Sequence, residues 1–124
     1  MSVRSLADCM KKHYGQPVKF PGAKNLSPAF KSAIDARDIE AIRLFQKHIA
    51  SMCIIPSDYF TGIELLQKAK EYSEERLQEN SDDRLTVILS LLADQEGQLR
   101  SYLQQDELRV KAYIEKIRRD NHPS

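Results

Sequence analysis

The sequence is short of the residues that fold classes other than the helical bundle require. It has only 4 glycines and 5 prolines in 124 residues, and it has no runs in which valine, isoleucine and threonine alternate with polar residues. A β-sheet therefore has little from which to form. Leucine, isoleucine, alanine, glutamate, lysine, glutamine and arginine dominate instead, and most of these favour helices. The composition predicts an all-α fold in a single domain, residues 1–124, built as a compact bundle of about five helices.

Long apolar runs and cysteines are also scarce. The most apolar stretch, 85–93, has only nine residues, whereas a membrane span needs about 20. The opening MSVRSLADCMKK lacks the apolar core of a secretory signal. Cys9 and Cys53 are too few to form a disulfide framework. We therefore expect a cytoplasmic protein with no membrane span.

Excess charge of one sign is absent, because the formal net charge is only +1. This argues against a protein that binds nucleic acid by bulk electrostatics. The charges are nevertheless segregated, since 1–31 and 109–120 are rich in lysine and arginine while 64–83 is rich in acids. Two interpretations stay open: ordinary solvated helix faces, or a polarised surface that steers a charged partner or pairs with a second copy.

Catalytic and cofactor motifs are missing as well. The sequence has no glycine-rich phosphate loop, no HExxH and no GxSxG. Cys9 with His13, and His48 with Cys53, are too loosely spaced to indicate a Cys2His2 metal site. A nucleophilic pair of Cys53 with either histidine has no local signature. We expect no metal, no cofactor and no enzymatic activity.

Caps and apolar spacing divide the chain into five predicted helices, at 3–14, 28–36, 39–53, 59–80 and 81–119. Val3 is placed on the inner face of the first, and Ser5 with Asp8 has the pattern of a capping box. Ser27-Pro28 is the predicted start of the second. A loop at 15–26 separates these two helices and carries Val18 and Phe20, which either pin the loop to the core or form an exposed recognition segment.

The segment SPAFKSAIDARDIEAIRLFQ resembles one ankyrin repeat, with its SP opening and its IEAIRLF helix. A solenoid needs about three stacked units, and no second copy follows. The segment therefore predicts only a local pair of helices joined by a short turn.

The last predicted helix, 81–119, is the longest element and forms an antiparallel hairpin with the helix before it. Its first part, 85–93, is apolar almost all round and is predicted to be enclosed on several sides. A heptad repeat that starts at Leu85 and ends at Ile117 has ten core positions. Eight of them are apolar, and the exceptions are Glu96 and Asp106. The highly charged second half of helix 59–80 is expected to project into solvent, which leaves the stripe from Leu99 to Ile117 without a cover.

This uncovered stripe is the predicted partner-binding site. The candidate contact residues are Leu99, Tyr102, Leu103, Val110, Tyr113 and Ile117, together with Phe20 from the loop. The competing interpretation is that the stripe packs within the chain. If it is exposed, either another protein or a second copy of this chain is expected to cover it, the latter giving a homodimer.

The predicted function is non-enzymatic: an inhibitor or regulator that binds and occludes a partner enzyme. The alternatives are a nucleic-acid-associated protein that uses the basic segment 1–31, and a small enzyme that depends on Cys53. A chain that opens MSVRSLADCMKKHYG and ends in a long helix rich in glutamine and lysine resembles the small helical effectors of Legionella. It is similar in size and character to the inhibitor of the ubiquitin-deamidating effectors. That resemblance implies a ubiquitin-pathway enzyme as partner and the host cytosol as location.

Overall fold

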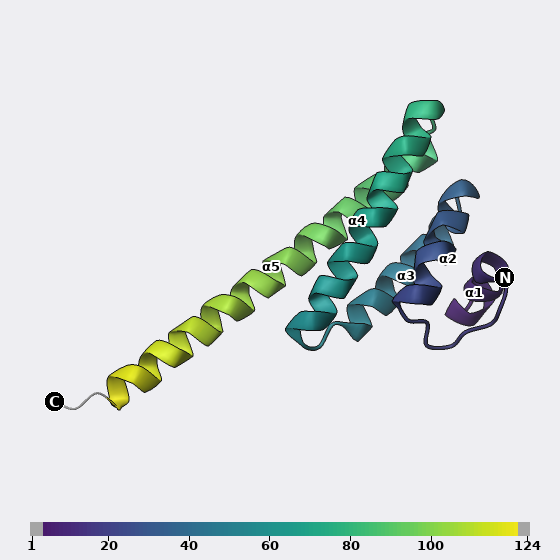
Figure 1. Cartoon of the computed structure of the whole chain (residues 1–124). Coiled ribbons are helices and arrows are strands. Elements are labelled where there is room, and N and C mark those ends of the chain that lie inside the picture. The colour runs from purple at the N-terminus through teal and green to yellow at the C-terminus, as the bar shows by residue number, and fades with distance from the viewer. Residues whose placement is uncertain (1–3, 122–124) are drawn as a thin grey trace.

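The structure is a computed structural model that describes residues 4–121, and over that range it contains five helices and no strand. The helices are α1 (Leu6–Tyr14), α2 (Ala23–Asp35), α3 (Ile39–Met52), α4 (Pro56–Glu79) and α5 (Asp83–Asp120). The first three pack together at one end, and α4 and α5 form a long antiparallel pair beside them (Figure 1). The predicted all-α bundle with a C-terminal hairpin is confirmed.

α1 ends at Tyr14, as the sequence predicts, but it begins at Leu6 and not at residue 3, because Ser5 is the cap. The Ser5 hydroxyl accepts a hydrogen bond from the Asp8 N–H at 3.1 Å, and the Asp8 carboxylate accepts one from the Ser5 N–H at 3.0 Å. This reciprocal capping box satisfies two of the free N–H groups at the helix start. Gly15 ends the helix with φ of 93°, a left-handed conformation that glycine adopts without strain. Val3 lies outside the described residues.

The start of α2 differs from the prediction. The helix begins at Ala23 and not at Pro28, which lies within it. The Gly22 N–H donates to the Asn25 side-chain oxygen at 3.0 Å, and Leu26, in the added turn, is fully buried. Pro28 has no N–H to donate to the preceding turn, which costs one helical hydrogen bond. Burying a leucine contributes about 2 kcal/mol, and this gain favours extending the helix toward the N-terminus.

The start of α4 also lies earlier than predicted, at Pro56 instead of Tyr59. Proline is well suited to the first position of a helix, where its missing N–H has no intrahelical partner to lose. The Asp58 carboxylate accepts hydrogen bonds from the N–H groups of Ile54 and Ile55, at 3.2 and 3.1 Å. Asp58 therefore fixes the α3–α4 connection from inside the helix.

The core lies between α1, α2, α3 and the inner faces of α4 and α5. Phe30 and Phe45 meet edge to face, with ring centroids 5.3 Å apart. α3, α4 and α5 approach one another closely at Gly62 on α4, because a Cβ at this position would lie 3.2 Å from Ile49 of α3 and 3.2 Å from Leu99 of α5. The missing side chain of Gly62 lets these helices come together.

The α4–α5 hairpin corrects two predictions. The charged second half of α4 does not project alone, since Ala69 and Ser73 are buried against the bundle and Leu77 is partly buried. The apolar start of α5 is covered on one side and not all round, because Leu85, Ile88 and Leu92 are buried while Val87 is 43% exposed. α5 packs against α4 and α3.

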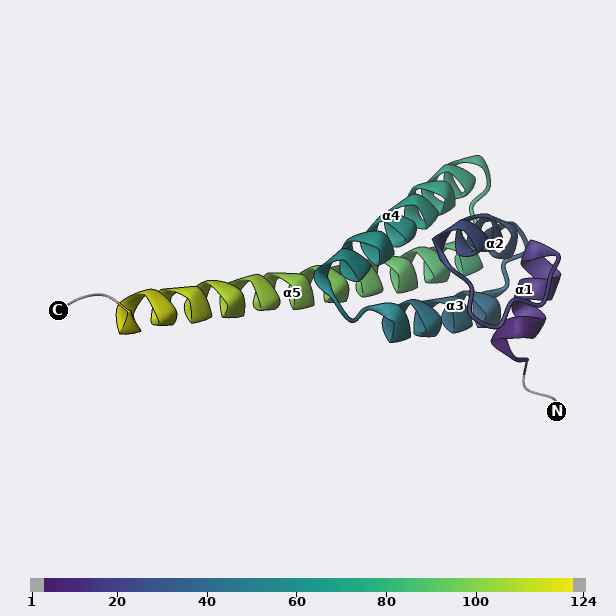
Figure 2. The same ribbon diagram turned by 60° about the horizontal axis from the view of Figure 1, so that its bottom comes forward.

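α5 is one continuous helix through Gly97 and Asp106, about 57 Å long. Only its first part is paired. Beyond the start of α4, the helix runs on by itself, away from α1–α3 (Figure 1, Figure 2). Every residue from 107 to 120 is exposed. We call this unpaired segment, residues 107–120, the arm.

Candidate protein-binding site

The predicted site residues on α5 divide into two groups. Leu99 and Leu103 are buried, Leu103 with only 8% of its surface exposed, so they belong to the core of this chain and not to an open stripe. Tyr102, Val110, Tyr113 and Ile117 are exposed. The intramolecular interpretation therefore holds for Leu99 and Leu103, and the exposed interpretation holds for Tyr102 and for the stripe beyond Leu103.

Phe20 is exposed but is not brought together with the arm. Its side chain is 86% exposed, while Val18 in the same loop packs against the core. The loop lies on the α1–α3 side of the molecule, and the arm leaves from the other side (Figure 1, Figure 2). The structure therefore separates Phe20 from the other predicted contact residues.

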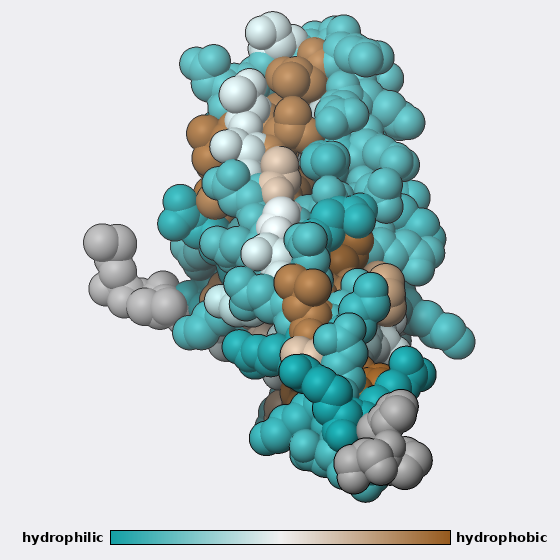
Figure 3. Space-filling model, turned by 90° about the vertical axis from the view of Figure 1, so that its left-hand side faces the viewer, coloured by the Kyte–Doolittle hydropathy of each residue, from teal (hydrophilic) through white to brown (hydrophobic). Residues whose placement is uncertain are grey.

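The arm carries a narrow line of apolar side chains. These residues recur at helical spacing on one face, and we call them the arm stripe: Val110, Tyr113, Ile114 and Ile117. Tyr113 is the most exposed of them, at 65%. Viewed from the side toward which α5 projects, the surface shows brown apolar patches at intervals among hydrophilic groups (Figure 3). Such a stripe on a rigid helix is an arrangement that a partner can cover.

A groove opens where the arm leaves the bundle. It has a volume of about 300 Å³, and its lining residues come from the start of α4 and from α5: Pro56, Phe60, Leu103, Asp106, Glu107, Val110 and Lys111. Phe60 is 58% exposed. Because Val110 belongs to both features, the groove and the arm stripe form one continuous surface.

Several exposed apolar residues are not among the contact residues that the sequence predicts. Ile54 and Ile55 lie in the α3–α4 connection, and Leu108 lies on the back of the arm, opposite the stripe. The heptad pattern could not identify them, because Leu108 is out of phase and the connection has no periodicity. Ile114 was recognisable as a neighbour of Tyr113 on the same face.

A second polar cluster has the residue types of a hydrolase triad. His13 Nδ1 lies 2.9 Å from Ser32 Oγ, and His13 Nε2 lies 2.7 Å from Asp38 Oδ2. Asp38 is, however, already paired with Arg4, and the His13 side chain is only 2% exposed. Arg4 and the hydrogen bonds from His13 and the Ala41 N–H hold the pKa of Asp38 well below its usual range. The arrangement fastens α1 to α2 and α3 and has no approach for a substrate.

The two cysteines and the remaining histidine lie apart from this cluster. Cys9 is fully buried and Cys53 is half-buried, and burial raises the pKa of both thiols. A raised pKa lowers the thiolate fraction at neutral pH and with it nucleophilic reactivity. His48 Nε2 contacts the Pro21 carbonyl oxygen at 2.8 Å. Within residues 4–121, no group of three or more His, Cys, Asp or Glu is placed to hold a metal ion.

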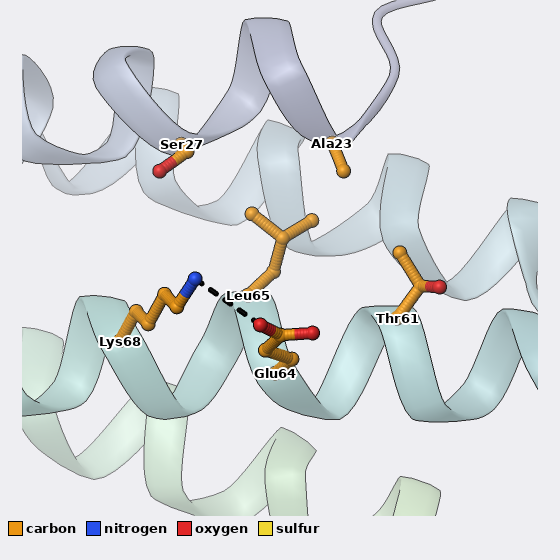
Figure 4. A pocket seen from close by; sticks show the side chains of 6 residues that line it. All are labelled: Ala23, Ser27, Thr61, Glu64, Leu65 and Lys68. Carbon is orange, nitrogen blue, oxygen red and sulfur yellow. Dashed lines mark ion pairs between the residues drawn. The ribbon is translucent and has the colours of Figure 1, made fainter.

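A smaller hollow lies between α2 and α4 (Figure 4). Its volume is about 120 Å³, with Leu65 reaching toward α2 between Ala23 and Ser27. At its edge, Lys68 Nζ and Glu64 Oε1 are 3.1 Å apart, so the two charges compensate each other. The residues that line the hollow present no group positioned to bind a ligand. The groove and the arm therefore remain the candidate binding site.

Comparison with protein-family models, with curated proteins and with solved structures finds no match to this chain. Among the described residues, no helix is long and apolar enough to cross a membrane. The site must therefore be interpreted from its own geometry.

Proposed function

We propose that this protein is a non-enzymatic binding protein, which uses the arm to dock on another protein and to cover part of that partner's surface. The observation that carries the proposal is the arm itself: a helix segment anchored on a packed bundle, with an apolar stripe that no other part of residues 4–121 covers. Burying side chains such as Val110 and Ile117 contributes about 1.5–3 kcal/mol each, before the costs of association.

The anchoring of the arm supports a role in binding. α5 is paired with α4 and α3 over its first part, so the arm continues a helix that is already formed. An isolated helix of the same length is marginal in water, because nucleation is costly. A preformed helix loses less conformational entropy on binding than a segment that must fold at the interface. Tyr113 is the expected energetic centre, since rigid aromatic anchors dominate such interfaces.

The proposal extends to the class of partner and to location. We propose that the protein acts in the cytoplasm as an inhibitor or regulator of an enzyme. The resemblance to the helical inhibitor of Legionella suggests a ubiquitin-deamidating enzyme. Purified protein should then lower the rate of ubiquitin deamidation by such an enzyme in a stoichiometric manner. An unchanged rate would remove this class of partner while leaving the binding proposal in place.

The binding proposal is tested by site-specific photo-crosslinking. A crosslinker placed at Tyr113 should capture a defined partner from the extract of the cell in which the protein acts. The same group at Leu108 is the matched control, because Leu108 is equally exposed but lies on the opposite face of the arm. Equal capture at both positions, or capture at neither, would overturn the proposal.

A substitution pair gives an independent test. Val110→Asp with Tyr113→Asp should abolish association, because both residues lie on the arm stripe, while Leu108→Asp should leave association intact. All three positions are exposed, so helix content and thermal unfolding should be unchanged in each variant. Loss of binding in the Leu108 variant alone would contradict the assigned face.

A further inference from the structure

Basic side chains predominate along both edges of the arm stripe. With 3.6 residues per turn, Arg109 and Lys116 lie along one edge of the stripe, and Lys111 and Arg118 lie along the other. All four side chains are exposed. The arm has three acidic residues, Glu107, Glu115 and Asp120. Glu115 lies on the back, Glu107 lies on the edge of Lys111 next to the bundle, and Asp120 lies on the edge of Arg109 at the tip, so each edge holds two cations and one acid at its end.

Three of these four cations have no carboxylate of this chain within 4 Å among the described residues. The exception is Arg109, whose Nη1 lies 3.8 Å from Asp106 Oδ1 in an exposed pair. Elsewhere on α4 and α5 the chain pairs its basic groups, as Lys70 with Glu96 at 3.6 Å and Arg76 with Glu79 at 2.9 Å. The arm is therefore the part of the α4–α5 hairpin in which basic side chains without an ion-pair partner lie beside apolar surface.

We propose, on the basis of the function proposed above, that the partner surface is an apolar groove with carboxylates along both of its edges. In such a complex the arm stripe fills the groove, and each line of cations faces a line of acids. Charge complementarity of this kind speeds encounter and fixes the register of the helix more than it adds to affinity. It also rejects grooves with basic edges, because like charges brought together across an interface are costly.

The charge pattern distinguishes this partner from a second copy of the chain. In an antiparallel pair of arms, the edge with Arg109 and Lys116 faces the same edge of the other copy, so two edges of net positive charge oppose each other despite Asp120 at the tip. The width of the stripe distinguishes the partner from an anionic membrane. A helix that lies in a bilayer interface has a broad apolar face with bulky residues, whereas this stripe has the width of a seam between helices.

The test uses two designed helical peptides with the same apolar heptad core. One has glutamate at every flanking position and the other has lysine. Binding of each to the full-length protein is measured by fluorescence anisotropy. The glutamate peptide should bind about tenfold more tightly than the lysine peptide, and raising the salt from about 0.05 M to about 0.5 M should remove most of the difference.

Charge variants supply the specificity control. The combined change Arg109→Glu, Lys111→Glu, Lys116→Glu and Arg118→Glu should reverse the preference of the arm. Because four new acids near a helix C-terminus can unwind it, the same four positions are also changed to glutamine, which should abolish the preference with the helix intact. Arg119→Glu, on the back of the arm, should change nothing.

Several outcomes would overturn the inference. These are equal binding of both peptides, stronger binding of the lysine peptide, and binding of phosphatidylserine vesicles without binding of the glutamate peptide. Self-association that buries Tyr113 and excludes the glutamate peptide would overturn it as well. The proposed function fails separately. If a crosslinker at Tyr113 captures a partner but both peptides bind equally, the proposed binding function is supported. The inference that the partner groove has acidic edges is then wrong.

Discussion

The guanidinium of Arg4 donates two hydrogen bonds, each 2.8 Å long, to the two carboxylate oxygens of Asp38. Asp38 is also the N-cap of α3, accepting a hydrogen bond from the Ala41 N–H at 3.2 Å. One carboxylate thus ties the segment before α1 to the start of α3 and, through His13, to α1 itself. This arrangement makes stability sensitive to acid.

We predict that the protein loses stability as the pH falls below about 4, the ordinary pKa of aspartate. The pKa of Asp38 is lower in the folded chain than in the unfolded chain, so the folded state favours the ionised form. The stabilisation is therefore complete above the unfolded pKa and is lost as the pH falls from there toward the folded value. Urea unfolding across the range from about pH 7 to about pH 2 measures this loss.

The matched variants are Asp38→Asn and Asp94→Asn. The first should cost about 2–3 kcal/mol at neutral pH and flatten the acid dependence, because the charge that Arg4 pairs with is gone. Asp94 is exposed and has no ion-pair partner among the described residues, so its variant should behave as the parent chain does. An unchanged acid profile in Asp38→Asn would show that other carboxylates control it.

The two glycines within helices should respond in opposite directions. Gly97 has nothing within 4 Å of its missing Cβ, so Gly97→Ala should raise stability by about 0.5–1 kcal/mol through helix propensity. At Gly62 the space is already filled by Ile49 and Leu99, so Gly62→Leu should destabilise by about 1–3 kcal/mol through overpacking. Thermal unfolding followed by circular dichroism compares them. A stabilised Gly62→Leu would contradict the close approach of α3, α4 and α5.

Leu103 and Val110 stand one heptad apart on α5 and should behave differently. Leu103→Ala should cost about 2–3 kcal/mol, because the removed side chain is packed beneath the start of α4. Val110→Ala should change the free energy of unfolding by less than about 0.5 kcal/mol, since the side chain is mostly exposed. Equal costs at both positions would mean that the arm is covered within the chain.

The thiols should differ in their reaction with iodoacetamide. Cys53 is half-buried and its pKa is raised, mainly by burial and further by Asp58, so at pH 7 it should react more slowly than free cysteine. Cys9 is fully buried and should react only when the chain unfolds. Mass spectrometry after timed labelling separates the two. Rapid modification of Cys53 at neutral pH would favour the alternative of a cysteine-dependent enzyme.

Local sequence signals predicted the helices well where the signal was a side-chain cap. The capping box at Ser5, the helix end at Tyr14 and the helix start at Ile39, which Asp38 caps, are all where the sequence placed them. Proline was the less reliable marker. The Ser27-Pro28 pair predicts a helix start, but Pro28 lies inside α2. Pro56 lies before the predicted start at 59, but it begins α4. A proline restricts only its own turn, and burial of Leu26 or capping by Asp58 decides the rest.

The sequence also could not reveal contacts between distant segments. Gln46 and Gln95 each donate a side-chain hydrogen bond to a carbonyl of the other helix, at 2.8 and 2.7 Å, which fastens α3 to α5. Arg4 and Asp38 are 34 residues apart and carry no shared motif. Whether such residues pair depends on which helices pack against each other, and a single sequence contains no signal for that packing.

What the sequence determined by itself was a helical pattern over 81–119 and the face on which its apolar residues lie, because helical periodicity is a local property. The structure decided that this helix is unbroken through Gly97 and Asp106. What only the tertiary structure decided was where that face stops being core. α4 begins at Pro56, three residues earlier than the sequence indicated, and covers α5 as far as Leu103. Helical periodicity shows which residues share a face of α5, but the length and position of α4 decide which of them are exposed to solvent. The arm begins where that cover ends.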